Sequence, residues 1–208
     1  MTSLYYLNKI EKLGTPFLTT VMLRRLFPSL PRRTLEDLIA RLVKSGFLQR
    51  VSRGKYLVLS KDANIFEIAY FLYNPSYISL ETALNHYGIL SQFPTLITSV
   101  TTRRSVLLNA ESIGEFEYVH IPKRLLTGFT KEGRALFATP EKALFDYLYQ
   151  IAVGRKTDNI LDELNYSTIN LAKLREYLPF VPTTKASTIS KLIKKIETDY
   201  ANKKEVIF

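Results

Sequence analysis

The sequence contains no cysteine. This absence excludes a disulfide scaffold, a cysteine nucleophile and a zinc site built from thiolates. No apolar run approaches the roughly 18 consecutive residues that a membrane-spanning helix needs. The first nine residues, Met-Thr-Ser-Leu-Tyr-Tyr-Leu-Asn-Lys, lack the basic start and the long apolar core of a signal peptide. We therefore expect a cytoplasmic protein with no membrane partner.

Glycine and histidine are also scarce. The eight glycines form no phosphate-cradling loop, and neither a nucleoside-triphosphate nor a dinucleotide fingerprint is present. His86 and His120 have no second metal-ligating residue at helical spacing, and we interpret both as structural. The sequence therefore predicts a protein that is not an enzyme and that needs no cofactor and no metal ion.

The positive charge of the chain is concentrated at one end. The 208 residues are 46% hydrophobic and 23% charged, which is typical of a folded protein, and their net charge is +10. Residues 1–62 carry 12 Lys and Arg against 4 Asp and Glu, a balance of +8, whereas residues 63–208 carry 17 against 15. This asymmetry predicts a polyanionic partner for the first 62 residues.

The same 62 residues show the pattern of a helical unit that ends in a β-hairpin. Apolar residues at helical spacing predict three helices: residues 4–13, 19–27 and 31–45. Gly46 ends the third helix, and the period then becomes that of two strands: residues 47–51 and 55–59. Gly54 suits the turn between the strands. We therefore expect residues 1–62 to form a winged helix-turn-helix domain that binds double-stranded DNA.

The predicted third helix can present a polar face to DNA, because an apolar stripe occupies its other side. In a helix-turn-helix, the N-terminal residues of the second helix reach base edges in the major groove. We predict base contacts from four residues: Arg32, Arg33, Thr34 and Asp37. We predict phosphate or minor-groove contacts from nine more: Lys44, Arg50, Ser52, Arg53, Lys55, Thr19, Thr20, Arg24 and Arg25. Some winged helices bind only proteins, which is the alternative to DNA binding.

Residues 60–64 are polar and mark the predicted domain boundary. Beyond them we expect a mixed α+β domain over residues 63–208. Its predicted helices cover residues 65–73, 79–87, 139–150, 171–178 and 184–200. Its predicted strands cover residues 96–102, 115–121 and 135–138. Ser79 suits an N-cap, and Thr139, Pro140 and Glu141 begin a helix in the preferred order of cap, proline and acid.

The second domain contains one acidic and two basic groups of residues that are candidates for a functional site. Glu115 and Glu117, with Lys123 after the strand, could form a metal-dependent nuclease site, although alternation with aromatic residues is typical of a half-exposed strand. A partner or a second DNA surface could use two basic groups: Thr102, Arg103 and Arg104, and Lys191, Lys194 and Lys195. The last group lies on a predicted amphipathic helix, for which simple docking is the plainer interpretation.

Three stretches of the second domain resemble a known family. Residues 77–88, Tyr-Ile-Ser-Leu-Glu-Thr-Ala-Leu-Asn-His-Tyr-Gly, are similar to the central domain of AbiEi-like antitoxins, as are residues 98–103, Thr-Ser-Val-Thr-Thr-Arg. Residues 138–146, Ala-Thr-Pro-Glu-Lys-Ala-Leu-Phe-Asp, resemble a helix start in the same proteins. The resemblance covers roughly residues 5–150, whereas the helical tail, residues 151–208, has no match.

The resemblance implies an antitoxin of a bacterial toxin–antitoxin or abortive-infection (phage-defence) system. Such a protein represses its own operon by binding inverted repeats in the promoter DNA, and it antagonises a nucleotidyltransferase-like toxin without necessarily forming a stable complex with it. One alternative is a plain winged-helix regulator whose second domain senses a ligand or forms dimers. A second alternative is the metal-dependent nuclease.

Overall fold

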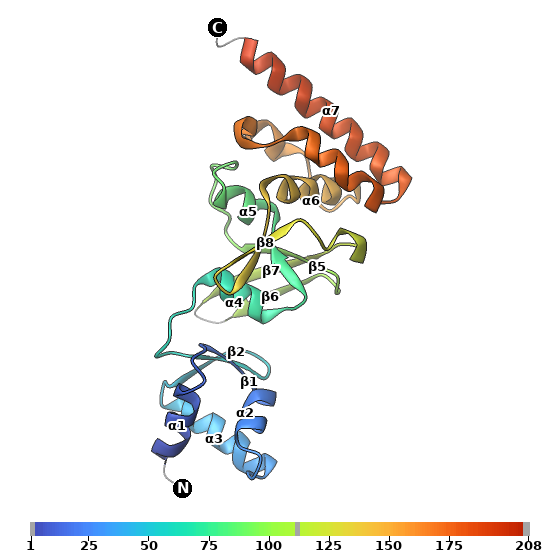
Figure 1. Ribbon diagram of the computed structural model, residues 1–208. Helices are drawn as coiled ribbons and strands as arrows, with labels where there is room; N and C mark the ends of the chain where they lie inside the picture. Colours follow the sequence, from blue (N-terminus) through green and yellow to red (C-terminus); the bar gives the residue numbers. More distant parts are fainter. Residues whose placement is uncertain (1–2, 111–112, 206–208) are drawn as a thin grey trace.

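The protein has an α+β architecture with two sheets, of which one is antiparallel and the other is mixed. The computed structural model describes residues 3–110 and 113–205. Figure 1 shows a smaller N-terminal part at the bottom and a larger part above it, where helices stack on both sides of a central sheet. The smaller part contains a three-stranded sheet in the order β1-β3-β2, and the larger part a six-stranded sheet in the order β6-β7-β5-β4-β9-β8.

The N-terminal part contains all the helices and both strands that the sequence predicted there. Its elements are α1 (Ser3–Glu11), β1 (Phe17–Thr19), α2 (Thr20–Leu26), α3 (Arg32–Lys44), β2 (Leu48–Ser52) and β3 (Lys55–Val58). The Thr19 hydroxyl caps α2 by accepting a hydrogen bond from the Met22 amide at 3.1 Å. Gly46 and Gly54 take positive φ angles of 73° and 71°, as the helix end and the hairpin turn require.

Strand β1 is an addition to the predicted elements. It has only three residues, and it pairs antiparallel with β3 from Phe17↔Leu57 to Thr19↔Lys55. So short a segment carries no recognisable period of its own, because alternation needs at least four residues to show. Its partner strand, far away in the sequence, is what makes it a strand.

The hairpin of β2 and β3 contributes to two hydrophobic clusters at once. Tyr56 and Val58 belong to the core of the N-terminal part, together with the buried stripe of α3: Leu35, Leu38, Ile39 and Leu42. Val51 and Leu57 belong to a different cluster, which includes Ile68 of α4 (Ile65–Leu72). Successive residues of a strand point to opposite faces, so β3 is covered on both sides. Residues before and after the predicted boundary at residues 60–64 therefore pack in one hydrophobic cluster.

The six-stranded sheet combines three predicted strands with three unpredicted ones. The predicted strands are present as β5 (Ile97–Thr101), β7 (Gly114–His120) and β9 (Ala135–Ala138). The others are β4 (Ser76–Ile78), β6 (Val106–Ala110) and β8 (Phe129–Glu132). The pairs β5–β7 and β4–β9 are parallel, and the remaining neighbours are antiparallel. In Figure 1, α4 lies on the side of the sheet that faces the hairpin, and α5 (Leu80–His86) lies on the other side.

The C-terminal helices cover the same side as α5. They are α6 (Pro140–Ala152), the 3-10 helices η2 (Asn159–Glu163), η3 (Tyr166–Thr168) and η4 (Leu171–Phe180), and α7 (Thr183–Glu205); a further 3-10 helix, η1 (Lys123–Leu125), follows β7. Helix α6 begins as predicted, with Thr139 accepting from the Lys142 amide at 3.3 Å. The segment predicted as a helix over residues 171–178 is a 3-10 helix containing Pro179, which has no N–H for a helical bond.

A buried polar network lies between the sheet and α6. Lys142 and Asp146, one turn apart on α6, are fully buried and form an ion pair. Asp146 Oδ2 also accepts hydrogen bonds from the Tyr77 and Ser79 hydroxyls, each at 2.8 Å. Ser79 occupies the N-cap position of α5, as predicted, but its side chain makes no capping bond, because its hydroxyl donates to Asp146 instead. The Thr82 amide near the start of α5 donates to the Thr98 hydroxyl, at 3.1 Å.

Candidate nucleic-acid interface

Helix α3 presents a polar face that is free of packing. Its stripe of Leu35, Leu38, Ile39 and Leu42 is at most 6% exposed, which fixes the rotation of the helix about its axis. Arg32, Arg33, Thr34 and Asp37 are all exposed at the N-terminal end of α3, as the sequence predicted. Pro31 occupies the N-cap position and makes no side-chain hydrogen bond to the helix. The first amides of α3 are therefore not capped by that side chain.

An open groove of about 640 Å³ runs between α3 and the β2–β3 hairpin. Four predicted DNA-binding cations line it: Arg32 and Lys44 from α3, and Arg50 and Arg53 from the hairpin. Thr20, at the start of α2, lies against the hairpin turn and donates from its amide to the Gly54 carbonyl at 2.9 Å. The groove therefore brings together positive charge from α3 and from the hairpin, which are separate in the sequence.

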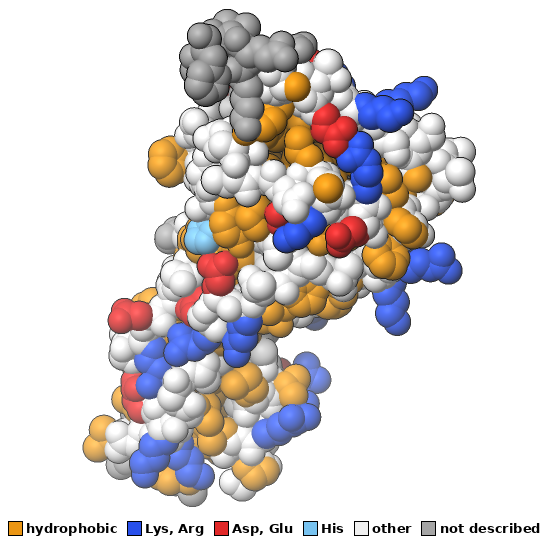
Figure 2. Space-filling model, turned by 45° about the horizontal axis from the view of Figure 1, so that its top comes forward, with side chains coloured by type: hydrophobic (Ala, Val, Ile, Leu, Met, Phe, Trp, Pro, Cys, Tyr) orange, Lys and Arg blue, Asp and Glu red, His pale blue; other side chains and the backbone are white. Residues whose placement is uncertain are grey.

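The cations of the groove are only partly neutralised. Among its lining residues the one carboxylate is Glu36, which accepts from Arg32 Nε at 2.8 Å. This pair raises the pKa of Arg32, chiefly through the hydrogen bond, and it leaves the Arg32 side chain 80% exposed. Lys44, Arg50 and Arg53 are exposed as well, with net positive charge in the groove as the result. Figure 2 shows groups of Lys and Arg side chains around the lower, N-terminal part, where few acidic side chains accompany them.

Sequence reasoning missed the apolar floor of this groove. Tyr56 of β3 lies directly opposite Arg50 of β2, and Ala40 and Val43 line the groove from α3. Tyr56 is 9% exposed and reads as a core residue in the sequence. The available signal was its cross-strand register, since opposite residues in a hairpin share one face.

The other predicted contacts of the N-terminal part have mixed positions. Arg24 and Arg25 at the end of α2 are exposed. Thr19 is half-buried and its hydroxyl already accepts the capping bond of α2. Ser52 is half-buried at a bulge in β2, where the register shifts between Arg50 and Ser52. The exposed cations are thus better placed for a partner than the two hydroxyl residues.

Lys55 points away from the groove and toward the second part of the chain. Its Nζ donates to the main-chain carbonyls of Phe71 and Leu72, at 2.7 and 2.8 Å, and lies 5.1 Å from the Phe71 ring centre. Burial lowers the pKa of Lys55, and the charge of Arg103 lowers it further. These carbonyls end α4, where a cation is favoured by the helix dipole. We therefore correct the expectation for Lys55, because its ammonium group joins the hairpin to α4.

The two basic groups considered for a partner or a second DNA surface lie on separate elements. Arg103 packs on the Tyr73 ring, 4.0 Å from its centre, and donates to the Asn74 carbonyl; Thr102 is half-buried and Arg104 exposed beside it. Lys191, Lys194 and Lys195 are exposed on α7, at the opposite end of the molecule from α3 (Figure 1). Lys195 also pairs with Asp158 at 3.6 Å. No single surface can therefore include both groups and α3.

The carboxylates that suggested a nuclease have another neighbour. Lys156 donates to Glu81 at 2.6 Å and to Glu117 at 3.4 Å, so the lysine beside Glu117 is Lys156 and not the expected Lys123. Glu115 is exposed. Within residues 3–110 and 113–205, His, Cys, Asp and Glu form no group of three that could hold a metal ion. His86 contacts Glu132 at 3.1 Å, and His120 Nδ1 lies 2.9 Å from the Arg103 carbonyl.

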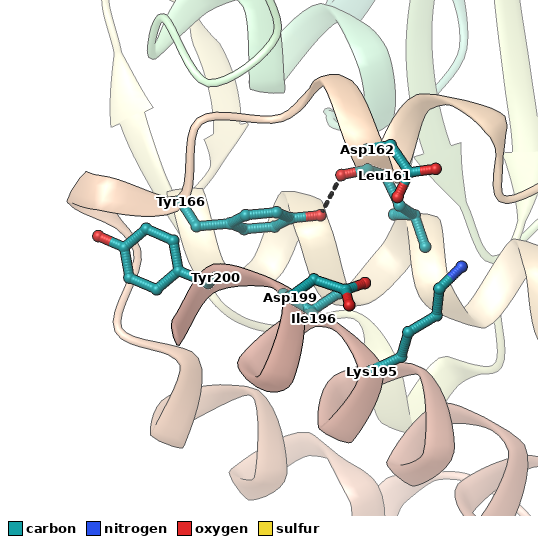
Figure 3. A pocket seen from close by; sticks show the side chains of 7 residues that line it. All are labelled: Leu161, Asp162, Tyr166, Lys195, Ile196, Asp199 and Tyr200. Carbon is teal, nitrogen blue, oxygen red and sulfur yellow. Dashed lines mark hydrogen bonds between the residues drawn. The ribbon is translucent and has the colours of Figure 1, made fainter. Parts of the chain in front are cut away.

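A small enclosed hollow lies where α7 packs on the preceding 3-10 helices (Figure 3). Its volume of about 10 Å³ is roughly that of one water molecule. The Tyr166 hydroxyl donates to the Leu161 carbonyl at 2.7 Å, and Asp162 and Asp199 line the same hollow. Burial and these two carboxylates raise the pKa of Tyr166. A hollow of this size is too small for a ligand, and we interpret it as a packing gap beneath α7.

Comparison with protein-family models and with curated proteins finds no match to this sequence. The resemblance to AbiEi-like antitoxins therefore depends on the stretches quoted above. None of the helices in the described residues is long and apolar enough to cross a membrane.

Proposed function

We propose that the protein binds double-stranded promoter DNA through an N-terminal winged helix-turn-helix. The observation that carries this proposal is the groove between α3 and the hairpin, lined by Arg32, Lys44, Arg50 and Arg53. With α3 in the major groove and the hairpin at the minor groove, the phosphate ridge between them falls into this groove. Arg33, Thr34 and Asp37 then face base edges, and an arginine there can pair with guanine through two hydrogen bonds.

The test is a gel-shift titration of the full chain on the DNA upstream of its own gene, over a series of salt concentrations. Each lost phosphate contact should reduce the slope of log affinity against log salt by about 0.9. Arg50→Ala and Arg53→Ala should each show this reduction, and the double variant about twice as much. Lys131→Ala, an exposed lysine on β8, is the matched control and should leave the slope unchanged. Unchanged binding in the double variant would refute the interface.

We further propose that DNA binding serves an antitoxin that represses its own operon and antagonises a nucleotidyltransferase-like toxin. The support is the resemblance, together with the way its motifs meet in space. Tyr77 and Ser79 come from the first quoted stretch, Lys142 and Asp146 from the last, and all four form one buried network. The motifs therefore specify the core of the second part, and the role in antagonising the toxin comes from the resemblance.

Coexpression with the product of the adjacent gene tests the antitoxin proposal. If that product stops growth, the wild-type chain should restore it. Arg50→Ala/Arg53→Ala should still restore growth when produced from an independent promoter, if neutralisation does not depend on DNA. A non-toxic neighbour, or toxicity that the wild-type chain leaves unchanged, would contradict the antitoxin role while leaving DNA binding intact.

The alternative, a plain regulator, is favoured by one specific observation. The hairpin shares a hydrophobic cluster with α4, and Lys55 binds the end of that helix. A ligand that shifted α4 would therefore also shift the hairpin. In that case the gel shift on the same promoter would respond to a small molecule, and coexpression would protect against no toxin.

A further inference from the structure

Strand β6 is an edge of the six-stranded sheet. It pairs antiparallel with β7, from Val106↔Tyr118 to Ala110↔Gly114, and the sheet order places no other strand of the described chain beside it. An edge strand presents backbone N–H and C=O groups on its outer side, and these groups are a template for another strand. Proteins usually guard such an edge with charged side chains, proline or a covering element.

The other edge of the same sheet shows such a guard. Strand β8 carries the exposed Lys131, next to Glu132, which accepts hydrogen bonds from Tyr87 and pairs with His86. The sequence of β6 is Val-Leu-Leu-Asn-Ala and contains neither charge nor proline. Leu107, the second residue of the strand, is 59% exposed. The charged residues of β8 therefore have no counterpart within β6.

The surroundings of β6 leave room on one side. Val106 and Leu108 pack toward the cluster around α4. Leu107 points to the opposite side, onto a hollow of about 420 Å³ that Glu117 and Arg155 also line. A strand added at this edge could therefore cover Leu107 without displacing α4.

We propose that β6 pairs antiparallel with β6 of a second copy of this chain, which joins the two sheets into one across a two-fold axis. An antiparallel pair of identical strands is self-complementary, as a two-fold interface requires. Because β6 is uncharged, no register of the pair opposes like charges within it. The excess charge of +8 belongs to residues 1–62, whereas residues 63–183 hold 11 Lys and Arg against 12 Asp and Glu, a balance of −1.

Charges beside the two ends of β6 favour the same arrangement. Arg104 is exposed just before the strand begins, and Glu115 lies opposite Asn109 near its C-terminal end. In an antiparallel pair, the basic end of each strand lies near the acidic end of its partner. A five-residue pairing is small, so we expect a dissociation constant of roughly micromolar or weaker. The inference does not depend on DNA binding, although a two-fold dimer would present two α3 helices to an inverted repeat.

The natural absence of cysteine makes a trapping experiment direct. In a register centred on Leu108, residue 107 of one copy faces residue 109 of the other, within the Cα separation that a disulfide can bridge. A mixture of Leu107→Cys and Asn109→Cys chains should give a disulfide-linked dimer under mild oxidation, seen on a non-reducing gel. Thr130→Cys, at an exposed position on the guarded edge β8, is the control and should stay monomeric.

Light scattering over a concentration series measures the dimer without a cross-link. Leu107→Lys should weaken dimerisation by roughly tenfold or more, because it adds a charge at a strand pair and removes an apolar contact from each copy. Leu107 is exposed, so the variant should keep the wild-type circular dichroism spectrum and thermal unfolding.

Two results would overturn the proposal. In the first, the wild-type chain stays monomeric and the cysteine mixture gives no cross-link. In the second, the chain forms a dimer, but Leu107→Lys leaves that dimer intact and Thr130→Cys cross-links it. A dimer that binds no DNA would refute only the proposed function, and a monomer that binds DNA would refute only the dimer.

Discussion

Replacing Lys142 by methionine removes one partner of the buried ion pair in α6 and leaves Asp146 fully buried. Breaking such a pair from one side costs about 3–5 kcal/mol. Tyr77 and Ser79 still donate to Asp146 in the variant, so we expect the lower end, about 3 kcal/mol. For a chain of this size that corresponds to a fall in melting temperature of roughly 6–12 °C.

The pH dependence of this loss distinguishes an electrostatic cause from a packing defect. Burial already raises the pKa of Asp146, and Lys142 opposes that rise. Without Lys142 the folded-state pKa of Asp146 moves further above the ordinary value of 3.8. Below pH 3.8 the Asp146 carboxyl is protonated in both the folded and the unfolded state, so the loss of stability is small. This loss grows as the pH rises toward the folded-state pKa. The destabilisation by Lys142→Met should therefore be smaller near pH 4 than near pH 8.

Asp146→Asn should show the opposite trend. Burial lowers the pKa of Lys142, and Asp146 opposes that shift. In the variant, the buried ammonium group is destabilising at neutral pH, and it loses its charge as the pH rises toward 10.5, the ordinary value. The loss of stability should therefore shrink at alkaline pH.

Urea unfolding followed by far-ultraviolet circular dichroism measures both effects, since the chain has no tryptophan for fluorescence. Lys142→Met/Asp146→Asn is the control: the amide oxygen still accepts from Tyr77 and Ser79, no charge remains buried, and most of the stability should return. The reasoning fails if the two single variants show the same pH trend, or if the double variant loses the sum of both single losses.

Three further predictions concern the surface. Arg33→Ala should weaken DNA binding by roughly 1–3 kcal/mol and relax the preference at one base position, in gel shifts with base-substituted operators; equal losses on all sequences would contradict base contact. Lys55→Met should lower the free energy of unfolding by roughly 1.5–3 kcal/mol, because the hydrogen bonds from its ammonium group to α4 are lost. It should leave the salt dependence of DNA binding unchanged in the gel-shift titration. The hydrogen bond from Arg175 lowers the pKa of Glu197. The wild-type chain should therefore be slightly more stable than Glu197→Gln above pH 4.5, and this difference should vanish in melting curves as the pH falls through the folded-state pKa.

Local signals predicted the helices well, because caps, glycines and apolar spacing act within a few residues. Thr139 and Pro140 marked the start of α6, and Gly46 the end of α3, and both assignments are confirmed. Short strands escaped prediction for the opposite reason. Strands β1 and β4 have three residues each, and their partners β3, β5 and β9 lie far along the chain. Pairing at long range, rather than their own residues, makes them strands.

The candidate site shows the same division between local and distant effects. The helical wheel of residues 31–45 correctly separated the buried stripe from the exposed Arg32 and Arg33. The hairpin residues could not be separated in this way. Arg53 lines the groove, whereas Lys55, two residues later, turns to the carbonyls of Phe71 and Leu72. That choice depends on where α4 ends in space, which no local pattern contains.

The sequence by itself determined the asymmetry of charge, with +8 in the first 62 residues, and the order of helices and hairpin that carries it. Charge and period are properties of neighbouring residues, so they can be read along the chain. The tertiary structure alone decided that Arg32, Lys44, Arg50 and Arg53 share a groove and that β6 is an uncharged edge. Both features are created by packing between distant segments. A groove forms only where two elements pack side by side, and a strand is an edge only in relation to the order of the whole sheet.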